Sequence, residues 1–63
     1  MQAHQERVVA EKADLDEKIG KLDVFIHGTI YPTLDEAERA RLMRQLCHMR
    51  DYSNVLTERI AAF

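Results

Sequence analysis

Apolar residues in the second half of the chain recur at alternating intervals of four and three residues, with one polar interruption at Ser53. This spacing places them on a single face of an α-helix. The pattern therefore predicts a helix over about residues 34–61. Its apolar stripe comprises Leu42, Leu46, Met49, Leu56, Ile60 and Phe63.

The first half of the chain carries a similar stripe, in which Lys12 occupies a position that should be apolar. The apolar members of this stripe are Val8, Leu15, Ile19, Leu22 and Ile26. They predict a helix over about residues 3–26. With a turn over residues 27–33, the chain is predicted to be a single all-α domain spanning residues 1–63, a two-helix antiparallel hairpin.

The turn contains residues that end one helix and begin the next. Gly28 is a candidate C-terminal cap, because glycine adopts the left-handed conformation without a Cβ penalty. Pro32 disfavours helix in the residue before it. Thr33 and Glu36 have the spacing of a capping box, in which each side chain binds the backbone N–H of the other residue. We therefore expect the second helix to begin directly after Thr33.

Folding the two helices against each other aligns their stripes. Leu22 comes opposite Leu42, and Val8 comes opposite Leu56. The line along which the two stripes meet is called the seam. The two polar interruptions, Lys12 and Ser53, then lie opposite each other in this seam. A polar layer there fixes the register, as buried polar residues do in coiled coils, or forms a frayed and hydrated stretch.

The hairpin leaves many apolar residues outside its seam. These are Val9, Ala13, Val24, Phe25, Ile30, Tyr31, Met43, Cys47 and Val55. A domain of 63 residues buries only about 60% of its unfolded surface, so its stability is marginal. Uncovered apolar patches mark association surfaces, and we therefore expect a helical homo-oligomer.

Composition restricts the partners of the chain. Its net charge of −2 argues against a partner such as a DNA or RNA polymer, which requires a basic face. Cys47 is the single cysteine, so no intrachain disulfide forms. No apolar run reaches the roughly 18 residues of a membrane span, and the N-terminal segment lacks the features of a signal peptide. We expect a cytoplasmic protein that does not bind membranes.

The chain shows no motif of an enzyme. It has no glycine-rich phosphate loop, no HExxH and no nucleophile elbow. Acids such as Asp14 alternate with lysines, which is typical of a solvated helix face. His4, His27 and His48 do not have the spacing of a metal site. We expect no catalysis, cofactor or metal.

Charge is distributed unevenly along the chain. Residues 39–50 hold four arginines and one histidine without an acid, whereas residues 11–23 hold five acids and three lysines. This asymmetry has two interpretations. Either the two helices pair through complementary charged flanks, or some of the arginines face a small anionic ligand.

A second line of residues follows the apolar stripe of the second helix on one side. The line comprises His48, Tyr52, Val55 and Arg59, and Arg44 and Gln45 lie about one turn before it. An aromatic ring can stack on a base, and a guanidinium can bind a phosphate through a planar fork. The alternative is that this line is the amphipathic border of the apolar stripe, which we call the shoulder of the helix. Tyr52 would then lie in a subunit interface and Arg59 would form a salt bridge.

The chain also resembles a known family. The residues that carry the resemblance are Lys21-Leu22, Phe25-Ile26, Leu42, Leu46, Met49, Tyr52, Leu56 and Arg59-Ile60. In this pattern the chain is similar, over nearly its whole length, to a family of small phage proteins. Their shared helical-hairpin domain occurs in anti-CBASS and anti-Thoeris sponge proteins.

The resemblance implies a binding function without chemistry. Proteins of this family assemble into helical oligomers, commonly hexamers, and sequester cyclic oligonucleotide or cyclic ADP-ribose-type immune signals between protomers. By this resemblance the partner is a cyclic di- or trinucleotide or a cyclic ADP-ribose isomer. The implied ligand-binding residues are Lys21, Arg44 and Arg59 for phosphate, Tyr52 for stacking, and Gln45 and His48 for hydrogen bonds. The alternative function is a non-catalytic oligomerisation or protein-interaction module with no small ligand.

Overall fold

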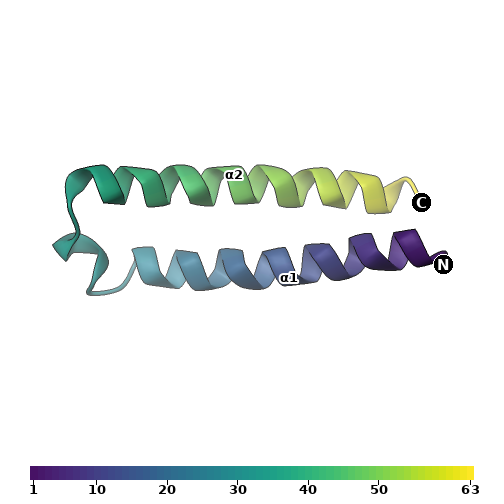
Figure 1. Cartoon of the computed structure of the whole chain (residues 1–63), viewed down its shortest axis with the longest axis horizontal. Helices are drawn as coiled ribbons and strands as arrows, with labels where there is room; N and C mark the ends of the chain where they lie inside the picture. The colour runs from purple at the N-terminus through teal and green to yellow at the C-terminus, as the bar shows by residue number, and fades with distance from the viewer.

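A computed structural model describes residues 1–63. Helix α1 spans Ala3–Ile26, a 3₁₀ turn η1 spans Tyr31–Thr33, and helix α2 spans Glu36–Ala61. The two helices run antiparallel in a rod of 46 × 15 × 13 Å, with both chain ends at one end of the rod and the turn at the other (Figure 1). The prediction of an all-α antiparallel hairpin is confirmed. Helix α1 covers the predicted range, and α2 begins two residues later than predicted.

The start of α2 corrects the expected capping box. Thr33 belongs to η1, and its hydroxyl donates a 2.5 Å hydrogen bond to the carbonyl oxygen of Ile30. Asp35 is the N-cap residue, and its carboxylate accepts a 3.1 Å hydrogen bond from the backbone N–H of Ala37. The capping-box prediction is wrong because the 3₁₀ turn continues through Thr33 and delays the helix.

Replacement of Asp35 by alanine is expected to lower the free energy of unfolding by about 1 kcal/mol, because it removes this acceptor from the first turn of α2. Urea denaturation followed by circular dichroism measures the change. Thr33→Ala is the matched control, since Thr33 does not cap α2. A larger loss for Thr33→Ala than for Asp35→Ala would contradict the assignment of the cap.

Gly28 also differs from its expected conformation. No glycine in the chain has a positive φ, and His27 is the residue that caps α1. The reason for glycine is steric, because a Cβ at this position would lie 3.3 Å from the carbonyl oxygen of Phe25. Gly28 therefore allows the chain to turn closely past the last carbonyl groups of α1.

The core of the hairpin is small. The buried apolar side chains are Val8, Leu15, Leu46 and Leu56. Leu56 is fully buried and clusters with Val8 and Leu15, while Ile19, Met49 and Ile60 pack around them. The predicted pairing of Val8 with Leu56 is confirmed by this cluster.

The two polar seam positions meet, as predicted, and form a hydrogen-bonded layer. The ammonium group of Lys12 donates to the Ser53 hydroxyl at 2.9 Å and to the Asp16 carboxylate at 2.7 Å. The Ser53 hydroxyl donates in turn to Asp16 at 2.5 Å. Ser53 is buried, whereas the side chain of Asp16 is 47% exposed, so the layer is hydrogen-bonded across the seam and open to solvent on one side. Asp16 is a third member that the stripe pattern did not identify.

This layer makes the free energy of unfolding depend on pH in the acidic range. The hydrogen bond from Lys12, assisted by that from Ser53, holds the pKa of Asp16 below its ordinary value of 3.8. A carboxyl whose pKa is lowered by folding stabilises the fold above its unfolded pKa, and this contribution is lost as pH falls through the folded pKa. We expect the urea midpoint of the wild type to fall below about pH 4, and that of Asp16→Asn to fall less. Parallel pH profiles for the two proteins would contradict this.

Candidate functional site

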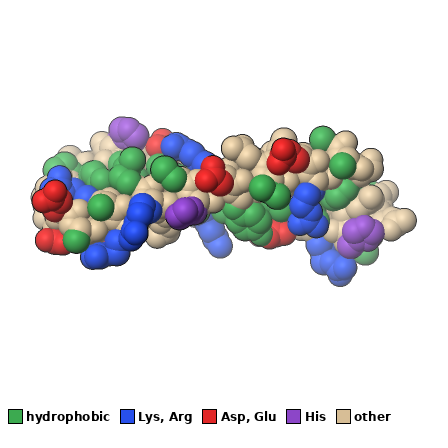
Figure 2. Space-filling model, turned by 90° about the horizontal axis from the view of Figure 1, so that it is seen from above, with side chains coloured by type: hydrophobic (Ala, Val, Ile, Leu, Met, Phe, Trp, Pro, Cys, Tyr) green, Lys and Arg blue, Asp and Glu red, His purple; other side chains and the backbone are tan.

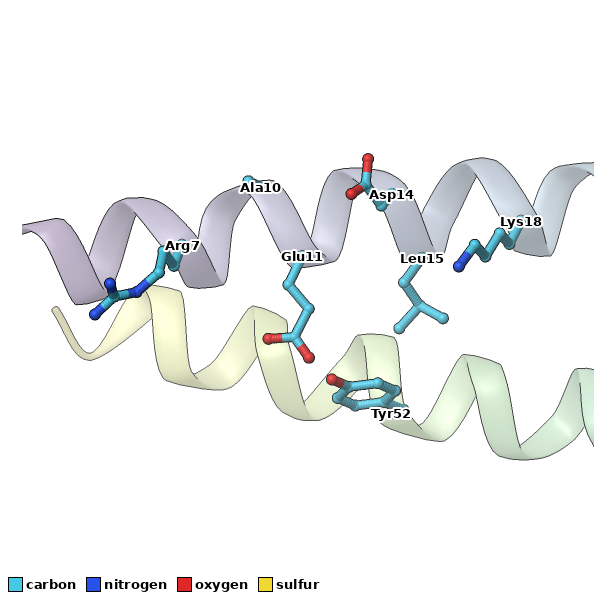
Figure 3. A pocket seen from close by; sticks show the side chains of 7 residues that line it. All are labelled: Arg7, Ala10, Glu11, Asp14, Leu15, Lys18 and Tyr52. Carbon is cyan, nitrogen blue, oxygen red and sulfur yellow. The ribbon is translucent and has the colours of Figure 1, made fainter.

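One flank of the hairpin contains a hollow of about 480 Å³. Six residues of α1 and Tyr52 of α2 line it (Figure 3). The lining residues of α1 are Arg7, Ala10, Glu11, Asp14, Leu15 and Lys18. The hollow therefore lies along the junction of the two helices, where α1 contributes most of the wall and α2 contributes an aromatic ring.

The helix periodicity explains this composition. The four charged lining residues of α1 follow one another at intervals of four, three and four, so they share one helix face. That face borders the seam residue Leu15, which is buried. Tyr52 directly precedes the seam residue Ser53, and its side chain is 44% exposed. Glu11 and Leu15 point toward the tyrosine ring (Figure 3).

The charges in the hollow have no partners within the chain. Neither the two cations, Arg7 and Lys18, nor the two carboxylates, Glu11 and Asp14, take part in any side-chain hydrogen bond or salt bridge of the hairpin. Arg7 and Lys18 lie at opposite ends, about 16 Å apart along the helix axis. The site therefore suits a molecule with anionic groups and hydrogen-bond donors.

Tyr52 is the one predicted site residue that lines the hollow. Lys21 instead forms a 3.1 Å ion pair with Glu17, and the Gln45 amide donates a weak 3.9 Å hydrogen bond to the sulfur of Met49. The remaining predicted site residues, Arg44, His48 and Arg59, are exposed on α2 and lie outside the lining.

The sequence reasoning missed the four charged residues of α1. Their spacing of four, three and four was visible, but alternating charges on a helix face are usually solvated. The decisive information is the pairing of the helices, which places this charged face of α1 beside Tyr52. A search for charged residues flanking the seam opposite Tyr52 would have found them.

Ion pairs of the arginine-rich stretch bear on the first interpretation of the charge asymmetry, the pairing of charged flanks. Arg50 bridges the helices through a 3.2 Å ion pair with Asp23, which is the expected pairing of charged flanks. Arg41 pairs with Glu38 within α2 at 2.8 Å. Arg44 and Arg59 form no salt bridge in the hairpin and stay available to a ligand or a second chain.

The structure contains no group of three or more His, Cys, Asp or Glu side chains that could hold a metal ion. Neither helix is long and apolar enough to cross a membrane.

Comparison with known proteins places the chain in a family. The Sequestin family model matches residues 2–62. The chain belongs to the Sequestin family. A curated relative from Enterobacteria phage T4, an uncharacterized 7.5 kDa protein in the denB-rIIB intergenic region, is 35% identical over 63 residues. The match covers 100% of this Sequestin chain and 98% of the relative. No solved structure gives a significant match. The family and the relative agree with a small phage protein of a sequestering family.

Proposed function

We propose that this Sequestin-family protein is a phage immune-evasion sponge. It binds a cyclic di- or trinucleotide or a cyclic ADP-ribose isomer in the cytoplasm of the infected bacterium and withholds it from the host effector. It does not cleave the signal, and it acts as a homo-oligomer, which by the family resemblance is a hexamer. The family match and the full-length phage relative support this proposal.

The observation that carries the proposal is the hollow beside Tyr52, with its unpaired cations. An aromatic ring offers a stacking surface to any base, because every base has a π-face. Arg7 and Lys18 offer charge to phosphate, and the planar fork of Arg7 can bind two phosphate oxygens at once. Stacking and phosphate binding are the two contacts that a nucleotide signal needs.

The carboxylates of the hollow add a requirement for the ligand. Glu11 and Asp14 would repel phosphate but accept hydrogen bonds from ribose hydroxyl groups or from an exocyclic amino group of a base. A nucleotide fits this lining when its phosphates lie toward Arg7 or Lys18 and its hydroxyl or amino groups lie over the carboxylates. Inorganic phosphate alone is expected to bind weakly.

Calorimetric titration with a panel of cyclic dinucleotides, cyclic trinucleotides and cyclic ADP-ribose isomers tests the proposal. At least one of them is expected to release heat on binding. After the protein is heat-denatured, chromatography should recover that ligand intact. Absence of binding across the panel would refute the nucleotide proposal, and recovery of a cleaved product would refute sequestration.

Two substitutions locate the site. Lys18→Gln is expected to weaken binding, because it removes a cation that lines the hollow. Arg44→Gln is the matched control, since Arg44 is an exposed, unpaired cation on α2 outside the hollow. Loss of binding in Arg44→Gln alone would move the site from the hollow to the exposed shoulder of α2.

The alternative is a non-catalytic oligomerisation or protein-interaction module with no small ligand. Exposed apolar side chains favour it, among them Val24, Ile30 and Val55, which are 73%, 58% and 50% exposed. One face of the rod carries apolar side chains among its charged groups (Figure 2). This alternative predicts that Tyr52→Ala alters assembly, whereas Arg44→Ala and Arg59→Ala are nearly silent.

A further inference from the structure

Glu11 lies between the two cations of the hollow along α1, with its carboxylate beside the ring of Tyr52. Figure 3 shows the Glu11 side chain extending from α1 toward this ring. Arg7 precedes Glu11 by four residues on the same helix face, but its guanidinium is directed away from the carboxylate (Figure 3). Glu11 forms no salt bridge in the hairpin, so it presents an unpaired carboxylate at the edge of the ring.

Asp14 is the other carboxylate of the hollow, and it is oriented differently. It follows Glu11 by three residues, and Figure 3 shows its carboxylate pointing away from α2 and from Tyr52. Both acids are exposed, and neither forms a salt bridge in the hairpin. The two acids therefore have the same charge and similar surroundings, but only Glu11 faces the aromatic ring.

A base that stacks on Tyr52 meets Glu11 with one of its edges. Stacking uses the face of the base and leaves its hydrogen-bonding edges open to the side chains around the ring. An ionised carboxylate can only accept hydrogen bonds, and its two oxygens can accept two parallel bonds at once. The edge that suits Glu11 is therefore one with two adjacent N–H donors.

Guanine is the common base with such an edge, because its ring N1–H and its 2-amino group donate side by side. Adenine and cytosine place an acceptor nitrogen next to their amino group, and uracil places a carbonyl oxygen on each side of its single N–H. Each of these edges directs a lone pair at one carboxylate oxygen, which leaves that oxygen without a donor. The carboxylate at the ring therefore favours guanine over the other bases.

Lys18 provides a cation for the other end of such a nucleotide. It lies seven residues after Glu11, about 10 Å away along the axis of α1. In a guanine nucleotide, the ribose and its phosphate leave the base on the side away from the N1–H and the 2-amino group. Lys18 can therefore bind the phosphate while Glu11 binds the base edge, and the carboxylate and the phosphate stay apart.

We propose that Glu11 is a specificity-determining residue of the hollow, and that it selects nucleotide signals containing guanine over those with only adenine or pyrimidine bases. This inference rests on the proposed function. It narrows the ligand from any cyclic nucleotide to one that brings a guanine edge to Glu11 when the base stacks on Tyr52.

Calorimetric titration with cyclic di-GMP, cyclic di-IMP and cyclic di-AMP tests the selection. The three molecules differ only in their bases, and hypoxanthine in cyclic di-IMP keeps the N1–H of guanine but lacks its 2-amino group. The wild type is expected to bind cyclic di-GMP roughly tenfold more tightly than cyclic di-AMP, with cyclic di-IMP between them, because hydrogen bonds to the carboxylate are lost in turn. Equal affinities, or binding of adenine ligands alone, would overturn the inference and leave the proposed function standing. Absence of binding by every cyclic nucleotide would overturn both.

The variants Glu11→Gln and Asp14→Asn separate hydrogen bonding from charge. Each removes one negative charge from the hollow, which by itself strengthens binding of an anionic ligand. Glu11→Gln is nevertheless expected to weaken binding of cyclic di-GMP roughly tenfold, while binding of cyclic di-AMP is kept or strengthened. Asp14→Asn is the matched control and is expected to keep the preference for guanine. A preference that survives Glu11→Gln, or one that disappears in Asp14→Asn, would overturn the assignment. Both side chains are exposed, so both variants are expected to keep the circular dichroism spectrum of the wild type.

Discussion

Replacing Leu56 by alanine is expected to lower the free energy of unfolding by about 2–5 kcal/mol. Leu56 is the fully buried side chain of the hairpin and clusters with Val8 and Leu15. Its truncation removes buried apolar area and leaves a cavity that helices held together by few other contacts fill only in part. Because a core of this size supplies about 3–5 kcal/mol in total, the variant is expected to be largely unfolded.

Thermal and urea unfolding followed by circular dichroism measure this loss. The matched control is Val55→Ala, which truncates a neighbouring apolar side chain that is 50% exposed. The control is expected to change the free energy of unfolding of the isolated hairpin by about 0.5 kcal/mol or less. A loss below 1 kcal/mol for Leu56→Ala would show that the seam is not where the chain derives its stability.

Replacing Tyr52 by alanine is expected to weaken binding of the nucleotide signal by roughly 5- to 150-fold, since stacking of a base on an aromatic ring contributes about 1–3 kcal/mol. Tyr52 is the one aromatic residue of the hollow. Its ring is half exposed, so its removal exposes little of the seam and is expected to leave the hairpin folded. Calorimetric titration of wild type and variant measures the change in affinity.

Tyr52→Phe is the control for this experiment, because it keeps the ring and removes only the hydroxyl group. It is expected to retain most of the affinity. Light scattering on the same samples separates ligand binding from assembly. Equal affinity of the wild type and Tyr52→Ala would contradict a stacking role, and a lower mass with no nucleotide binding in either protein would favour the interaction module.

The helices and their pairing were predictable because they rest on a long-range repeat. Each stripe contains many apolar positions, so a single exception such as Lys12 does not hide the period. The same repeat predicted that Lys12 meets Ser53, and the structure confirms this contact. The turn was less predictable, because several local hydrogen-bond patterns compete over a few residues. Thr33 satisfies the spacing of a capping box, yet it bonds to Ile30 within a 3₁₀ turn.

The candidate site was predictable from the sequence only at Tyr52. The spacing of Tyr52 relative to the apolar stripe marked it as a residue beside the seam. Arg7, Glu11, Asp14 and Lys18 have no chemical signature in isolation, because exposed charges on helices are common. They become candidates because they line one hollow with Tyr52, and that arrangement depends on the relative rotation of the two helices. The spacing within one helix does not contain this rotation, and only the apolar stripes of both helices taken together indicate it.

The location of the core also has a consequence for how the chain folds. Val8 and Leu56 are 48 residues apart in sequence. Val8 lies near the start of α1 and Leu56 near the end of α2, and Figure 1 shows these two helix ends together at one end of the rod. A hairpin that closes from the turn forms its local contacts first and reaches this cluster last. Partly closed forms therefore lack the best-packed contacts of the hairpin. Because this cluster forms last, unfolding is expected to be a single cooperative transition. Loosening of the first turns of α1 or the last turns of α2 is then coupled to unfolding of the whole hairpin.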